Sequence, residues 1–86
     1  MNKVQNRDLY ETLEVSSTAS QETIERMFRY LAQRYHPDRD TGDTDRFDEI
    51  AQAYHTLKEP ESRAAYAILR TMLALGAGAL PTIVNV

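Results

Sequence analysis

The sequence predicts an all-α domain built around an antiparallel pair of helices. Two stretches carry apolar residues three and four positions apart, the spacing that gathers them on one helix face. These residues are Ile24, Met27, Phe28, Leu31, Ala32 and Tyr35 in the first stretch, and Phe47, Ile50, Ala51, Tyr54 and Leu57 in the second. Pro37 lacks an amide N–H and disfavours a helical residue before it, so the first helix should end near Tyr35. A short polar loop, residues 39–44, then connects two helices of similar length, which should pack antiparallel with residues 36–38 at their tip.

Length and composition describe one small globular domain. The chain has 86 residues, of which 42% are hydrophobic and 27% charged, and a chain of this size buries roughly 60% of its unfolded surface. The absence of cysteine excludes disulfides and Cys-based zinc sites and is compatible with the cytoplasmic location that we expect. A net charge of −3 argues against a nucleic-acid partner, and residues 1–8 lack the apolar core of a signal peptide.

Helix boundaries can be predicted in chain order. Residues 1–7 form a polar lead-in, and Asp8 with Glu11 three positions later resembles a capping box that starts a short helix. Ser20 is a suitable N-cap for a helix that begins at Gln21 and ends at Tyr35.

The next helix should start near Asp43 or Thr44 and end by Lys58, because a proline follows. Pro60 suits the first position of a further helix, running from Glu61 to about Leu73. We expect the apolar residues of this last helix to cover one end of the helix pair; they are Ala64, Ala65, Ile68, Leu69 and Met72. Arg63 is expected to pair with a nearby acid rather than with a partner.

Residues 71–86 contain no charged side chain. A membrane span needs about 20 apolar residues, and this stretch is interrupted by two glycines and Pro81, so we do not expect it to cross a membrane. Three alternatives remain: a helix end followed by a poorly ordered tail, a strip that docks on another part of a longer protein, and a patch for self-association.

No set of residues predicts catalysis, a cofactor or a metal site. His36 lies near several acids, and an EF-hand loop counted from Asp38 would place Asp43 where the turn requires glycine, because Gly42 stands one position early. His55 is too far along the next helix to share a metal ion with His36. The sequence also lacks a Ser/His/Asp set and a glycine loop for phosphate, so we expect no enzymatic activity.

The spacing of several short motifs resembles the J-domain, the co-chaperone module of the DnaJ family. The resemblance extends from Asp8 to about Leu69, and we place the domain at residues 8–70. Its first half matches at Asp8-Leu9-Tyr10, Leu13-Glu14-Val15, Ala19-Ser20, Ile24, Phe28-Arg29, Leu31-Ala32 and Arg34-Tyr35-His36-Pro37-Asp38-Arg39. The second half matches at Phe47, Ile50, Ala53-Tyr54, Leu57, Pro60, Arg63 and Tyr66.

The resemblance implies four helices, of which the second and third form the antiparallel hairpin. It also implies a co-chaperone that docks on the ATPase domain of a DnaK-type heat-shock chaperone and stimulates its ATP hydrolysis. Asp38 would then pair with an arginine of the chaperone, while His36 and Pro37 hold the loop geometry. An acidic chaperone surface would be met by Arg26, Arg29, Arg34 and Arg39. From the helical pattern alone, most such arginines are simply a solvated face.

This sequence departs from the family pattern at the expected contact face. Family members usually carry a basic residue where Glu25 stands and another where Tyr30 stands, and glycine is usual where Glu14 stands. The loop after Asp38 is also shorter than in many members. These departures favour a specialised chaperone partner or a dependence on tethering. They also leave open an alternative function, a structural helical assembly module that has lost chaperone stimulation.

Overall fold

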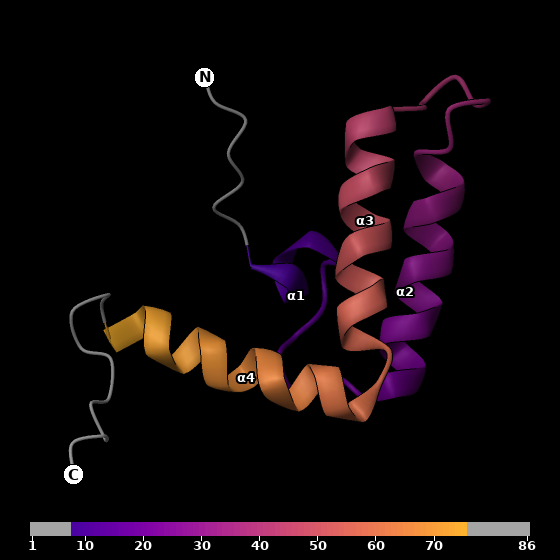
Figure 1. The fold of residues 1–86 in the computed structure, drawn as a ribbon. Coiled ribbons are helices and arrows are strands. Elements are labelled where there is room, and N and C mark those ends of the chain that lie inside the picture. Colours follow the sequence, from indigo (N-terminus) through magenta and orange to yellow (C-terminus); the bar gives the residue numbers. More distant parts are fainter. Residues whose placement is uncertain (1–7, 76–86) are drawn as a thin grey trace, which may run out of the picture.

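Helix α3 is the element against which the other three helices pack. The computed structural model describes residues 8–75, which form α1 (Leu9–Thr12), α2 (Gln21–Arg34), α3 (Thr44–Leu57) and α4 (Pro60–Leu75). Figure 1 shows α2 and α3 side by side, α1 beside α3, and α4 running crosswise from the end of the hairpin opposite the α2–α3 loop. The predicted all-α fold of four helices with an antiparallel hairpin is therefore confirmed.

A polar side chain caps the N-terminus of each of the first three helices. The Asp8 carboxylate accepts a hydrogen bond from the Glu11 amide at 2.9 Å, and the Ser20 hydroxyl accepts one from the Thr23 amide at 3.1 Å. Asp43 does the same for α3 with the Arg46 amide at 3.1 Å. Each bond satisfies an amide that has no partner within its own helix, which fixes where the helix begins.

The core lies between the hairpin and α1. Seven hydrophobic side chains are buried in it, namely Tyr10, Leu13, Ile24, Leu31, Ile50, Ala53 and Leu57. Phe28 and Tyr54, which the apolar pattern also assigns to the core, are only half-buried. Their rings stack across the hairpin with centroids 4.0 Å apart and planes at 6°, so they close the flank of the core rather than its centre.

The turn after α1 uses a left-handed residue. Glu14 has φ 57°, its amide donates to the Glu11 carbonyl at 3.0 Å, and the Val15 amide donates to the Tyr10 carbonyl at 3.0 Å. These two bonds define a Schellman motif, in which glycine is the usual residue at the left-handed position. A side chain with a Cβ therefore occupies a conformation that is unfavourable for it.

The predicted packing face of α4 is wrong. Ile68 is 61% exposed and Leu69 48% exposed, Ala64 and Ala65 are exposed, and Met72 is half-buried. The inward stripe of this helix instead consists of Arg63, Tyr66 and Arg70, at a spacing of three and four residues. Because α4 leaves the hairpin at an angle, it meets α1 and the linker before α2 through side chains long enough to reach them.

Arg63 does not pair with an acid, contrary to expectation. Its guanidinium group donates to the Tyr10 hydroxyl at 2.8 Å, the Gln21 side chain at 2.5 Å, the Ala19 carbonyl at 2.7 Å and the Ser17 carbonyl at 3.2 Å. Arg70 is the residue that reaches a carboxylate, at 3.1 Å from Asp8. The ends of α1, α2 and α4 are thus tied together at one corner by polar bonds.

Two predicted segments lie wholly or largely outside the described residues. The polar lead-in, residues 1–7, is one of them. Of the uncharged segment 71–86, residues 71–75 continue α4 and the remainder lies outside the description.

Candidate functional site

The loop between α2 and α3 presents His36, Pro37 and Asp38 at the end of the hairpin away from α1 and α4 (Figure 1). Helix α2 ends at Arg34, one residue before the predicted end, and Tyr35 is its C-cap, with an amide that donates to the Leu31 carbonyl at 2.9 Å. Pro37 follows two residues later and cannot continue the helical bonding, so the chain turns there.

Hydrogen bonds to its own carbonyls close this loop. The Arg39 amide donates to the His36 carbonyl at 2.9 Å, and the Gly42 amide donates to the Arg39 carbonyl at 2.8 Å. The Asp43 amide reaches back to the Tyr35 carbonyl at 3.0 Å, and the Thr41 hydroxyl donates to the carbonyl of Arg34. The loop backbone therefore has a defined conformation before any partner arrives.

Gly42 has a structural role in this loop that the sequence reasoning missed. A Cβ atom at this position would lie 2.5 Å from the His36 carbonyl oxygen, 2.9 Å from the Arg39 carbonyl oxygen and 3.0 Å from the Pro37 Cα. All three are backbone atoms that cannot move aside cheaply, so only glycine allows the loop to fold back on the tripeptide. A glycine at the end of a polar loop was the available signal.

The His36 side chain points back into the loop. Its Nδ1 accepts a hydrogen bond from the Asp38 amide at 3.1 Å, which requires that nitrogen to be unprotonated. The His36 ring also meets the Phe47 ring edge-on, with centroids 5.4 Å apart and planes at 72°. Histidine thus connects the tip of the loop to the first turn of α3.

Asp38 is turned toward solvent. Its side chain is 90% exposed, and its carboxylate lies 3.9 Å from Nδ1 of His36. That distance is too long for a hydrogen bond, and the exposed carboxylate remains available to another molecule.

The four arginines assigned to the site fall into two pairs. Arg26 and Arg29 lie on the exposed face of α2, and each forms an ion pair within the helix: Arg26 with Glu22 at 3.0 Å and Arg29 with Glu25 at 2.6 Å. Both side chains are largely exposed, so the pairs are surface pairs.

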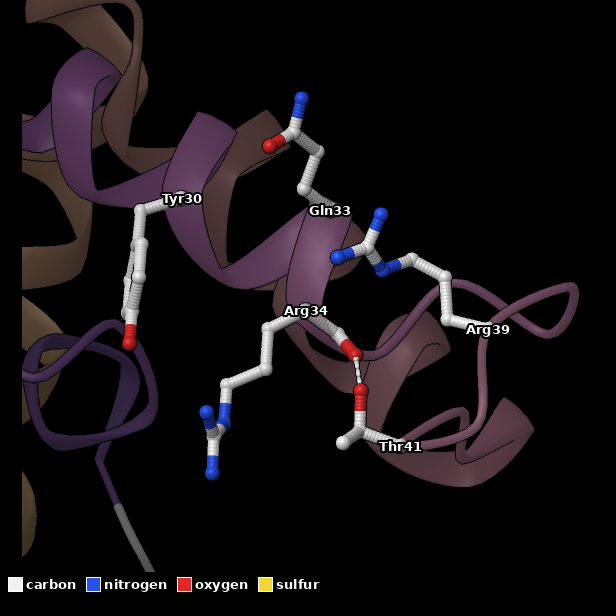
Figure 2. A pocket seen from close by; sticks show the side chains of 5 residues that line it. All are labelled: Tyr30, Gln33, Arg34, Arg39 and Thr41. Carbon is white, nitrogen blue, oxygen red and sulfur yellow. Dashed lines mark hydrogen bonds between the residues drawn. The ribbon is translucent and has the colours of Figure 1, made fainter.

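Arg34 and Arg39 line a shallow pocket beside the loop with Tyr30, Gln33 and Thr41 (Figure 2). Figure 2 shows Arg39 extending from the loop toward Gln33, while the side chains of Arg34 and Tyr30 point to the same side of α2. No carboxylate within residues 8–75 forms an ion pair with either arginine. The pKa of Arg34 is raised above its ordinary value, mainly by a side-chain hydrogen bond to Tyr35 and then by the charge interaction with Tyr30.

Neither metal binding nor membrane insertion finds support in the described part of the chain. Across residues 8–75, histidine and acidic side chains do not gather in a group of three or more suited to a metal ion. Within the same residues, each helix is too short or too polar to cross a membrane.

A family model described as "DnaJ domain" matches residues 8–67, a range that contains all seven candidate site residues. The chain is 52% identical over 63 residues to "Chaperone protein DnaJ" of Sinorhizobium medicae (strain WSM419), covering 70% of this chain and 17% of that protein. It is 54% identical over 63 residues to "Protein NolC" of Rhizobium fredii, with 70% and 16% covered.

A third relative, "Chaperone protein DnaJ" of Rippkaea orientalis (strain PCC 8801 / RF-1), is 50% identical over 74 residues, which cover 84% of this chain and 20% of the relative. The similarity to each of the three curated relatives thus spans a fifth or less of that relative's length.

Proposed function

Since this chain belongs to the DnaJ domain family, we propose that it is a co-chaperone module that docks on a DnaK-type heat-shock chaperone and stimulates its ATP hydrolysis. The observation that carries the proposal is the Asp38 carboxylate, which is 90% exposed on a loop whose backbone is closed by internal hydrogen bonds. We assign this function to residues 8–70, and the module itself carries out no reaction.

Asp38 is the residue that pairs with an arginine of the chaperone. A carboxylate that loses water on binding needs a charged, well-aligned partner, and such a pair is short and directional. Because the His36 and Gly42 contacts fix the loop beforehand, little conformational entropy is lost when the pair forms.

Arginines along α2 and the loop would contact an acidic surface on the same partner. The four residues concerned are Arg26, Arg29, Arg34 and Arg39. Exposed charges of this kind mainly steer the encounter and set the association rate, whereas the desolvated pair at Asp38 fixes the orientation. Stimulation then requires that the module bind more tightly to the chaperone state that hydrolyses ATP. Equal affinity for both states would leave the equilibrium between them unchanged.

The test is single-turnover ATP hydrolysis by a DnaK-type chaperone, with and without the 86-residue chain. Asp38→Asn preserves the shape of the side chain and removes its charge, so we expect it to abolish stimulation while the circular dichroism spectrum and melting temperature stay unchanged. Asp40→Asn, in the same loop, is the matched control and should stimulate like the wild type. Normal stimulation by Asp38→Asn would refute the assigned role.

The apolar side of α4 favours a second candidate function, a helical assembly module without chaperone stimulation. Its exposed large side chains are Ile68, Leu69, Leu73 and Leu75. A patch of this kind often marks an interaction surface. Under this alternative, the chain would self-associate in analytical ultracentrifugation, a combined Ile68→Ser and Leu73→Ser variant would be monomeric, and ATP turnover by the chaperone would not respond to the chain.

A further inference from the structure

The first turns of α2 carry their own carboxylates beside the arginines that a partner would contact. Glu22 holds Arg26 at 3.0 Å and Glu25 holds Arg29 at 2.6 Å, and these four side chains line one shallow surface depression. Each glutamate stands four residues before its arginine, which is the favourable order for such a pair on a helix. This part of the helix is therefore electrically neutral as a unit.

The tip of the hairpin differs in this respect. Arg34 and Arg39 line a pocket with Tyr30 and Gln33, and no acidic side chain in residues 8–75 forms an ion pair with them. The two arginines at this end of the hairpin, one in the last turn of α2 and one in the loop, are thus the ones that no glutamate of the same helix neutralises.

We propose that Glu22 and Glu25 are specificity-determining residues, which compete with the partner for Arg26 and Arg29. The chain then selects a chaperone whose acidic charge faces Arg34 and Arg39 at the tip, and it discriminates against one whose acidic charge extends along the first turns of α2. This inference rests on the proposed docking function and defines the kind of partner surface that the docking face fits.

The expected effects are moderate because the pairs are exposed. An exposed pair of this type favours the paired arrangement of glutamate and arginine over the unpaired one by about a factor of two. A carboxylate that faces an acidic partner surface adds a repulsion of similar or larger size. Glu25 is the better site for a test, because its pair with Arg29 is the shorter one and its side chain is half-buried against the helix. Removing its charge should strengthen docking on an acidic surface about threefold at low ionic strength.

The experiment measures the concentration of the 86-residue chain that gives half-maximal stimulation of single-turnover ATP hydrolysis by a bacterial DnaK. Four chains form a double-mutant cycle: the wild type, Glu25→Gln, Arg29→Gln and the double variant. Glu61→Gln on α4 is the matched control, because it changes the net charge equally at an exposed site away from the docking face.

We expect Glu25→Gln to lower the half-maximal concentration about threefold, Glu61→Gln to leave it within about 1.5-fold, and the difference to shrink as salt is added. In the wild-type background, Arg29→Gln should change the half-maximal concentration less than about twofold. In the Glu25→Gln background, the same substitution should change it about threefold or more. Arg34→Gln should weaken docking in both backgrounds.

Two results would overturn the inference while leaving the proposed function intact. One is a Glu25→Gln variant that matches Glu61→Gln, and the other is an equal cost of Arg29→Gln in both backgrounds. The proposed function itself fails if neither the wild type nor Glu25→Gln stimulates hydrolysis, or if stimulation persists in Asp38→Asn.

Discussion

Gly42 determines whether the loop can close over the tripeptide. With Gly42→Ala, the added methyl group would stand 2.5 Å from the His36 carbonyl oxygen, so the loop must open. We expect this variant to lose at least about tenfold in chaperone stimulation and only about 1–2 kcal/mol in the free energy of unfolding, because the clash is confined to the tip. Urea unfolding and single-turnover hydrolysis measure the two effects.

Thr41→Ala is the comparison for that prediction. It removes a hydroxyl bond to the Arg34 carbonyl but adds no atom, so its effect on stimulation should be smaller. A Gly42→Ala chain that stimulates normally would show that the loop geometry in the structure does not matter for docking.

Sequence reasoning located the tripeptide because its geometry follows from local rules. Pro37 stops a helix whatever surrounds it, and the apolar spacing on both sides fixed the hairpin. Gly42 could not be assigned in the same way, since the atoms that exclude a side chain there belong to residues three to six positions earlier and meet it only after folding. The sequence likewise shows that Glu22 and Glu25 each stand four residues before an arginine. It does not show that the resulting ion pairs cover part of the surface that a partner would contact.

At the scale of single elements, α1 ends in a Schellman motif whose left-handed position holds a residue with a Cβ instead of glycine. Glu14 sits at φ 57°, a conformation that costs a residue with a Cβ about 1 kcal/mol relative to glycine. We expect Glu14→Gly to raise the free energy of unfolding by about 1 kcal/mol, as measured by urea denaturation. The 3.9 Å contact between Glu14 and Arg46 is lost as well, but a partly exposed pair at that distance contributes little.

Glu14→Ala separates the two contributions. It removes the carboxylate and keeps the Cβ, so it should fail to stabilise the protein if backbone strain is the cause. Equal stabilisation by both variants would instead point to the charge.

Helix α4 shows why an apolar spacing can mislead. Ile68 and Leu69 obey the helical period, yet the helix turns them outward because Arg63 and Tyr66 make the contacts with α1. Periodicity identifies a helix and one face of it, but it does not say which face the neighbouring elements can reach.

At the scale of the molecule, the polar corner around Arg63 fastens α4 to the rest of the fold. This one guanidinium group bonds to α1 through Tyr10, to the start of α2 through Gln21, and to the linker carbonyl of Ala19. Arg63→Lys retains the charge but cannot reproduce the planar arrangement of donors. We expect it to lower the free energy of unfolding by about 2 kcal/mol, as measured by chemical denaturation.

Ile68→Ala on the same helix is the contrasting variant. Its side chain is 61% exposed, so the change should stay within about 0.5 kcal/mol despite the loss of a large apolar group. The reverse ranking, with Ile68→Ala the more harmful, would mean that α4 packs through its apolar side after all.

The closed loop has a consequence for anyone who wishes to imitate this surface with a small molecule. The carbonyl groups of Arg34, Tyr35, His36 and Arg39 already accept hydrogen bonds from residues 39–43, so the shape of the loop depends on all of these residues together. Because Phe47 and the capping of α3 help to support that arrangement, a linear peptide copied from the tip would sample many shapes and compete poorly. An effective mimic would need a cross-link that replaces both helices.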